Sequence, residues 1–298
     1  MKVVRDPAAL REALEPDRRA GRSIGLVPTM GALHAGHLAL LEAARRRCDV
    51  VVMSLFVNPR QFGPGEDLDA YPRDEVRDLE AAEHAGVGLV YAPPVERMYP
   101  EGFCTSVAVS GPATEVLDGD PARRGSDHFH GVTTVVAKLF NAVGPDVAFF
   151  GRKDAQQAIV IRQMVRDLDF PLEIEVVPTV REPDGLALSS RNAYLDAGER
   201  ARATALSRGL AAAETAALEG ATMDEALRLA ATELEAAGID PEYLEARHAD
   251  DLTPAQNFNG RPVLVAVAAR VGPARLIDNV VIESVGAEAP ANPEEESQ

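Results

Sequence analysis

The sequence predicts an α/β fold: a doubly wound, mostly parallel sheet in residues 1–180, followed by a smaller α+β domain in residues 181–285. Two observations predict the sheet. Strand and helix patterns alternate along the first 180 residues, and the strand patterns are continuous apolar runs, as in strands buried on both faces. A third observation separates the domains, because from about Arg181 alanine-rich helical stretches precede a cluster of strand patterns. Residues 286–298 are acidic, and we expect them to form a disordered tail.

The strands of the sheet are predicted from short apolar runs rich in β-branched residues. The run DVVVMSLFV at 49–57 is typical of a fully buried strand, and proline closes the run at 23–28. Parallel strands of this kind are connected through crossover helices. The predicted strands are residues 23–28, 49–57, 87–92, 147–150 and 172–177, with 105–109 as a short edge strand.

The helices are predicted from apolar residues at helical spacing and from their end signals. Leu38, Leu41 and Ala44 share one helical face, and the arginines at 45–47 suit the C-terminal end of that helix. Proline in the first turn and glycine at the stop delimit a helix over 72–86. Further helices are predicted at 131–143, 153–167, 197–218 and 223–237, and the strands of the second domain at 243–248, 263–271 and 276–282.

Composition and charge exclude several classes of protein. The chain has 298 residues and a net charge of −17, which repels DNA, so we expect no nucleic-acid partner. No apolar run reaches the ~18 residues of a membrane helix, and charge within the first six residues argues against a secretory signal. The two cysteines, Cys48 and Cys104, lie far apart without metal-type spacing. We therefore expect a cytoplasmic protein with no membrane partner.

Polar, glycine-containing turns follow four of the predicted strands. They cover residues 28–37, 58–63, 151–157 and 179–192. Ligands of open parallel sheets bind beyond the carboxyl ends of the strands, and a parallel sheet brings all four turns to that edge. The sequence therefore predicts a binding site there.

The first of these turns carries the most specific motif, Thr29-x-Gly31-x-x-His34-x-Gly36-His37. His34 and His37 are three residues apart at a predicted helix N-terminus, so they share a face. Helix N-termini favour phosphate groups, and two imidazoles can donate hydrogen bonds to a triphosphate without burying a fixed charge. An isolated His-x-x-His pair is more often structural, and as a zinc pair it lacks the further ligands that zinc needs.

Two later turns supply further groups that suit phosphate. Lys153 is one of only three lysines among 30 basic residues and is a compact charge for phosphate oxygens, while Asp154 beside it can hold Mg²⁺. Ser189, Ser190 and Arg191 offer two hydroxyls and a guanidinium. Taken alone, each of these groups is more typical of an exposed turn.

Several neutral and basic side chains near these turns are compatible with more than one role. Gln61 and Gln157 suit hydroxyl or carboxylate groups, or are ordinary polar residues. His128 and His130 lie near two arginines and mark an anion-binding loop, a dimer contact or a solvated loop.

Taken together and in order, these motifs resemble the pantoate–β-alanine ligase (pantothenate synthetase) family. The likeness runs from Val27 to about Asn279. It is densest in PTMGALHAGH at 28–37, SLFVNPRQFGPGEDLDAYPR at 54–73, HFHGVTTVVAKLFN at 128–141, GRKDAQQ at 151–157 and DGLALSSRNAYL at 184–195. The resemblance implies a Rossmann-like ATP-binding domain, a smaller C-terminal lid domain and a homodimer.

The resemblance also implies a two-step ligation. With ATP and Mg²⁺ as cofactors, the carboxylate of (R)-pantoate attacks the α-phosphate of ATP to give pantoyl adenylate and diphosphate; the amine of β-alanine then displaces AMP and forms pantothenate. By motif position, the catalytic residues are His37 as proton donor, His34 and Lys153. ATP is then bound by Met30, Gly31, Ala32, Leu33, His34, Ala35, Gly36, His37, Gly151, Arg152, Lys153, Asp154, Val180, Leu188, Ser189, Ser190 and Arg191. Pantoate is bound by Gln61, Gln157 and Tyr71, with Gln61 also at β-alanine and Asp154 at the metal.

The sequence departs from the family pattern in three places. The usual Arg-Pro-Gly-His-Phe is R-R-G-S-D-H-F at 123–129, so a phosphate role for Arg124 is not carried over. Arg152 stands where glutamate is common, and Ala155 where an aromatic residue is common.

Two other functions stay open on the residues alone. A nucleotidylyltransferase shares the histidine motif but gives no reason for Gln61 and Gln157. A noncatalytic adenylate-binding module is a second alternative, and the full phosphate-binding set counts against it. A rate of AMP formation that depends on β-alanine separates the ligase from both.

Overall fold

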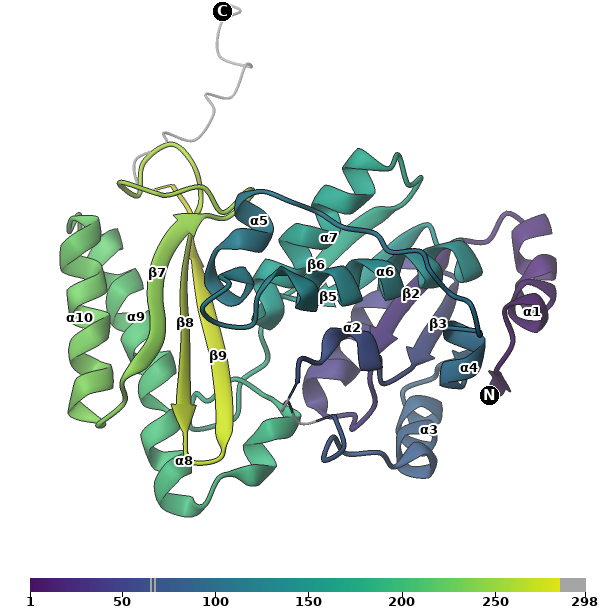
Figure 1. The fold of residues 1–298 in the computed structure, drawn as a ribbon, viewed down its shortest axis with the longest axis horizontal. Helices are drawn as coiled ribbons and strands as arrows, with labels where there is room; N and C mark the ends of the chain where they lie inside the picture. Colours follow the sequence, from purple (N-terminus) through teal and green to yellow (C-terminus); the bar gives the residue numbers. More distant parts are fainter. Residues whose placement is uncertain (65, 67, 285–298) are drawn as a thin grey trace, which may run out of the picture. The chain divides into compact units, whose positions relative to one another are not determined.

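The computed structural model describes residues 1–64, 66 and 68–284, and the chain divides into two compact units, Met1–Asp196 and Ala197–Gln298 (Figure 1). The boundary predicted from sequence lies near residue 180, whereas the structure keeps residues 181–196 with the first unit. Hydrogen bonds join this segment to earlier residues: the Leu188 N–H donates to the Val180 carbonyl, and the Tyr194 hydroxyl donates to the Ala70 carbonyl at 3.4 Å. The predicted tail at 286–298 lies outside the described residues.

A six-stranded sheet with the order β1-β4-β3-β2-β5-β6 forms the centre of the first unit, and neighbouring strands are all parallel. The chain runs from β2 through β3 to β4 in one direction and from β5 to β6 in the other, so the order reverses between β2 and β5. Open α/β sheets bind ligands at such a reversal. The predicted doubly wound sheet is confirmed. Its strands are β1 (Lys2–Val4), β2 (Ile24–Thr29), β3 (Val50–Leu55), β4 (Leu89–Tyr91), β5 (Val147–Gly151) and β6 (Glu173–Val177).

Two groups of helices cover this sheet. In the first, α2 (Ala35–Arg47) and α3 (Glu75–His84) bury Leu41, Ala44 and Ala82 against Val27 and Met53 of the strands. In the second, α6 (Ser126–Val143) packs on α1 (Pro7–Arg19) and α7 (Ala155–Asp167). Because the winding direction reverses, right-handed crossovers place the two groups on opposite faces. The short elements are α4 (Val95–Met98), α5 (Pro112–Glu115) and the 3₁₀ turns η1 (Pro59–Gln61), η2 (Leu117–Gly119), η3 (Arg152–Asp154) and η4 (Ser190–Tyr194).

The second unit has the α+β composition predicted for it. The helices α8 (Ala197–Ala203), α9 (Ala205–Leu218) and α10 (Met223–Ala236) precede an antiparallel sheet of β7 (Pro241–His248), β8 (Val263–Val271) and β9 (Ala274–Ile282). The single helix predicted at 197–218 is interrupted at Thr204. Across residues 1–64, 66 and 68–284, no helix combines the length and apolarity that crossing a membrane requires.

The edge strand predicted at 105–109 is wrong, because these residues form no strand. The Val107 N–H donates to Thr134 Oγ1 at 2.9 Å, and the Val107 carbonyl accepts from Thr133 Oγ1 at 2.6 Å. Hydroxyl groups of α6 therefore satisfy this backbone in place of a neighbouring strand. The elements β1 and α1 were not predicted.

Candidate active site

A cavity of about 250 Å³ in the first unit is lined by the turns that follow β2, β3, β5 and β6. It lies at the reversal of strand order, where the four polar turns converge as predicted. Of the predicted site residues, Gly31, Ala32, Leu33, Ala35 and Arg152 do not line it. Those that do are Met30, His34, Gly36, His37, Gln61, Tyr71, Gly151, Lys153, Asp154, Gln157, Val180, Leu188, Ser189, Ser190 and Arg191.

The two histidines of the motif cap the N-terminus of α2 with their own side chains. His34 is the N-cap, and its Nδ1 accepts from the Gly36 N–H at 3.1 Å. The Nδ1 of His37 accepts from the His34 N–H at 3.3 Å, and the ring centroids lie 4.1 Å apart. Because each Nδ1 accepts, the proton of each neutral ring is on Nε2. The pair therefore offers two Nε2–H donors.

Burial keeps both rings uncharged at neutral pH. Burial and, to a smaller extent, the neighbouring His34 together lower the pKa of His37 to about 3. The pKa of His34 is also lowered, first by burial and then by the positive charge of Lys153. The proton that His37 can offer at neutral pH is therefore the Nε2–H of a neutral ring rather than the proton of an imidazolium.

A buried carboxylate on α3 fixes the turn that leads to these histidines. Asp78 is 3% exposed, and its Oδ2 and Oδ1 accept from the N–H groups of Ala32 and Leu33 at 2.9 and 2.8 Å. Gly31 has φ +86°, and a Cβ there would lie 2.7 Å from Asp78 Oδ2. The amides of Ala32 and Leu33 are thus occupied by protein and are not offered to a ligand.

Replacing Asp78 by asparagine tests this arrangement. The amide NH₂ of the new side chain would face one of the two backbone N–H groups, so we expect the free energy of unfolding to fall by about 1–3 kcal/mol and activity to fall more than about tenfold. Denaturant unfolding and initial rates on the same sample measure both. The matched control is Asp74→Asn, which changes another carboxylate that accepts a backbone N–H on α3. Full activity in Asp78→Asn would contradict the role of the carboxylate in holding the turn.

Lys153 and the Ser189–Arg191 turn add charge and hydroxyl groups to the cavity. The Lys153 side chain is 19% exposed, and its Nζ lies 3.7 Å from Asp154 Oδ1. Ser189 Oγ accepts from the Arg191 N–H at 3.2 Å, which leaves the hydroxyl proton of Ser189 available to a ligand. The predicted phosphate-binding groups therefore share one cavity.

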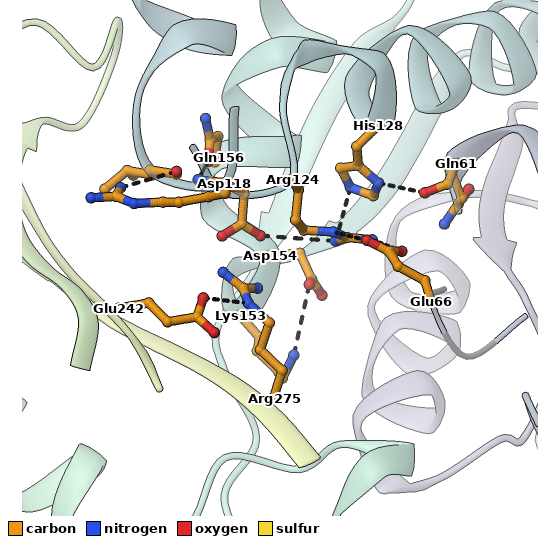
Figure 2. Close-up of polar contacts among 12 residues, drawn as sticks. Gln61, Glu66, Asp118, Arg124, His128, Lys153, Asp154, Gln156, Glu242 and Arg275 are labelled. Carbon is orange, nitrogen blue, oxygen red and sulfur yellow. Dashed lines mark hydrogen bonds and ion pairs between the residues drawn. The ribbon is translucent and has the colours of Figure 1, made fainter. Parts of the chain in front are cut away.

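The loop that carries Gln61 is fastened to α6 by a polar network (Figure 2). Arg124 makes a bidentate ion pair with Glu66, with distances of 2.9 and 2.7 Å, and its NH1 lies 3.9 Å from Asp118. The same guanidinium contacts Nε2 of His128 at 3.3 Å, and His128 Nδ1 donates to the Gln61 carbonyl at 2.7 Å. Arg124 lines the cavity and is engaged there by carboxylates of the protein.

Stability should fall with acid because His37 and His128 are buried in neutral form. Burial and, to a smaller extent, the charge of Arg124 lower the pKa of His128 from its ordinary value of 6.5 to about 4. Below pH 6.5 these histidines bind protons in the unfolded chain but stay neutral in the native state. The free energy of unfolding therefore falls as pH falls. Between pH 7 and pH 5 we expect a loss on the order of 2 kcal/mol per histidine.

The pH dependence of denaturant unfolding measures this effect. His128→Gln should reduce the slope of unfolding free energy against pH between 7 and 5 and leave the part that His37 contributes. An equal slope in wild type and His128→Gln would rule out His128 as a source of the acid sensitivity.

Asp78 and Asn58 are polar residues of the site that sequence reasoning did not single out. Asn58 is 1% exposed, lines the cavity and donates through Nδ2 to Gln61 Oε1 at 3.1 Å. An asparagine directly after a buried strand, at the carboxyl edge of the sheet, was the available signal. Asp78 carried none, since it lies within a helix 45 residues from Leu33 in sequence.

Comparison with known proteins gives a consistent result. The family profile described as pantoate-beta-alanine ligase matches residues 2–281. A pantothenate synthetase of Moorella thermoacetica is 53% identical over 287 residues, covering 95% of this chain and 99% of the relative. A pantothenate synthetase of Chloroflexus aurantiacus is 50% identical over 288 residues, covering 96% of this chain and all of the relative.

Solved structures agree with the sequence relatives. Pantothenate synthetase from Thermus thermophilus matches with a TM-score of 0.88 at 50% identity, covering 95% of this chain and 100% of that one. Pantoate-beta-alanine ligase from Francisella tularensis, complexed with beta-gamma ATP and beta-alanine, matches with a TM-score of 0.76 at 30% identity, covering 94% and 97%. The motifs, the fold and these likenesses over nearly the whole length lead to one conclusion: the chain belongs to the pantoate–β-alanine ligase family, the pantothenate synthetases.

Proposed function

We propose that the protein condenses (R)-pantoate with β-alanine, using ATP, to give pantothenate, AMP and diphosphate through an enzyme-bound pantoyl adenylate. One observation carries the proposal: two neutral Nε2–H donors, Lys153 and the Ser189–Arg191 turn line the same cavity as Gln61 and Gln157. The first set suits the phosphates of a nucleotide, and the glutamines suit a small hydroxy acid.

In the first step, a pantoate carboxylate oxygen attacks the α-phosphorus of ATP, and the bond from that phosphorus to the bridging oxygen breaks. The electron pair leaves with diphosphate. Negative charge on the phosphate oxygens is stabilised by the Nε2–H groups of His34 and His37 and by the ammonium group of Lys153. Ser189, Ser190 and Arg191 bind the departing diphosphate. Because the histidines are neutral and fixed by their caps, they are oriented before the nucleotide arrives.

In the second step, the neutral amine of β-alanine attacks the acyl carbon of the adenylate. The bond between that carbon and the phosphate oxygen breaks, AMP leaves, and the nitrogen loses a proton to solvent. Gln61, Gln157 and Tyr71 hold the pantoyl group during both steps, so the acyl carbon stays in place between them.

The residues present fit Mg²⁺ only as a companion of the nucleotide. Among residues 1–64, 66 and 68–284, no group of three or more His, Cys, Asp or Glu side chains could hold a metal ion. Mg²⁺ in nucleotide enzymes needs only one or two carboxylates, with phosphate oxygens and water completing the shell. Asp154 is exposed beside Lys153 and would supply that carboxylate. When bound, the ion supplies neutralisation of phosphate charge.

Formation of AMP from ATP and pantoate, with and without β-alanine, tests the function. We expect AMP in amounts equal to pantothenate only when all three substrates are present. No β-alanine-dependent AMP from folded protein would reject the ligase. Stable transfer of AMP to a phosphate acceptor would point to a nucleotidylyltransferase instead.

The homodimer follows from the family resemblance and the cytoplasmic location from the cysteine content, and both belong to the same proposal. We propose a cytoplasmic homodimer, and sedimentation equilibrium of the purified protein measures the assembly. The lid role of the C-terminal domain stays a prediction.

A further inference from the structure

The side chain of Asn58 has its orientation fixed by two backbone groups. Its Oδ1 accepts from the Arg60 N–H at 3.3 Å, and its Nδ2 donates to the Gly131 carbonyl at 3.1 Å. A backbone N–H can only donate and a backbone carbonyl can only accept. The oxygen and the nitrogen of this carboxamide are therefore unambiguously assigned.

This assignment fixes the direction of two further hydrogen bonds. The Tyr99 hydroxyl lies 2.7 Å from Asn58 Oδ1 and must donate to it. Gln61 Oε1 lies 3.1 Å from Asn58 Nδ2 and must accept from it. The other end of the Gln61 carboxamide, Nε2, contacts Met30 Sδ at 3.1 Å, and both Gln61 and Met30 line the cavity. Gln61 therefore presents an N–H donor to a ligand.

We propose that Tyr99 is a positioning residue that acts through Asn58 to hold Gln61 as a hydrogen-bond donor toward an oxygen acceptor of the substrate. The inference rests on the proposed function, in which that acceptor is a carboxylate or hydroxyl oxygen of pantoate. Tyr99 does not line the cavity, so it can affect substrate binding only through other residues.

The surroundings of Tyr99 suit this role. The Arg60 guanidinium lies 5.3 Å from the ring centroid, and the Phe103 ring packs edge-on at 5.1 Å, so the ring is held from two sides. Burial raises the pKa of Tyr99 to about 12, so the hydroxyl keeps the proton that it donates.

The close packing of α6 completes the arrangement. A Cβ on Gly131 would lie 2.1 Å from the Arg60 carbonyl oxygen, so only glycine lets the helix come near enough for Asn58 to reach the Gly131 carbonyl. Asn58 is 1% exposed and takes its hydrogen bonds from protein groups, so removal of the Tyr99 hydroxyl takes away the shortest of them. The Asn58 oxygen then keeps only its longer hydrogen bond from the Arg60 N–H, so the Asn58 side chain is held less firmly. Its hydrogen bond to Gln61 Oε1 weakens as a result.

A double-mutant cycle between Tyr99→Phe and Gln61→Met tests the proposal. Phenylalanine keeps the ring and its packing, and methionine keeps the length of the glutamine side chain without its polar atoms. We expect Tyr99→Phe alone to raise KM for pantoate about five- to tenfold while KM for ATP stays unchanged. In the Gln61→Met background the same change should have no further effect, because the group it positions is gone.

The control is Tyr91→Phe, at a buried tyrosine that does not line the cavity. It should leave both KM values unchanged. Calorimetric titration with pantoate replaces kinetics wherever turnover is too low to measure. Effects of Tyr99→Phe and Gln61→Met that multiply, or an equal change in KM for ATP, would overturn the proposal and assign Tyr99 a general structural role.

Failure of this inference differs from failure of the proposed function. A wild-type protein that forms no pantoate-dependent AMP contradicts the function itself. An active wild type in which Tyr99 and Gln61 act independently contradicts only the positioning role.

Discussion

Replacing His37 by asparagine should lower turnover by about 100-fold or more and leave the fold intact. The asparagine oxygen is as many bonds from the backbone as Nδ1 is, so it can still accept from the His34 N–H and preserve the cap. What disappears is the Nε2–H that we assign to the phosphate oxygens. Steady-state rates, with circular dichroism and thermal melting on the same sample, measure the two effects separately.

Two further variants separate catalysis from capping at this position. His37→Gln can place an amide N–H near the lost Nε2–H, so we expect part of the activity to return. His37→Ala removes donor and cap together and should lose both rate and stability. A turnover in His37→Asn close to that of wild type would exclude the donor role.

Lys153→Met should have an effect of similar size. The change keeps most of the length of the side chain but removes the ammonium group that stabilises phosphate charge in the transition state, so we expect kcat to fall about 100-fold or more. The positive charge of Lys153 also lowers the pKa of His34. The pKa of His34, followed by NMR titration, should therefore rise in the variant.

Two further variants separate the effect of the charge of Lys153 from the effect of its position. Lys153→Arg keeps the charge and should retain more activity than Lys153→Met. Lys138→Met removes a lysine whose Nζ lies 4.9 Å from the Phe103 ring centroid, outside the cavity lining, and should retain wild-type rates. Equal rates in Lys153→Met and wild type would remove Lys153 from the mechanism.

The sheet and its four turns were predictable because the signals are local. A buried parallel strand is a continuous apolar run, such as 49–57, and the turn after it lies next to it in sequence. The carboxyl edge of the sheet then brings the turns together without any further information. His34 and Lys153 could be placed in one cavity for this reason alone.

The contacts that hold those turns in place could not be predicted, because they join distant segments. Asp78 meets Leu33 across 45 residues, and Tyr99 meets Asn58 across 41. Thr133 satisfies the backbone of Val107 from a helix, and a run of alternating apolar residues gives no sign that its hydrogen bonds will go to hydroxyls. Local patterns predict which groups form the site, whereas packing decides which groups support it.

The bond between Asp78 and the turn has a consequence for the temperature range of the enzyme. The carboxylate belongs to α3, while the histidines that it supports belong to α2. Local opening of α3 needs no more free energy than global unfolding. Detachment of α3 from the turn would leave the two histidines without their fixed positions while the sheet stays folded. Heat should therefore inactivate the enzyme below its melting temperature.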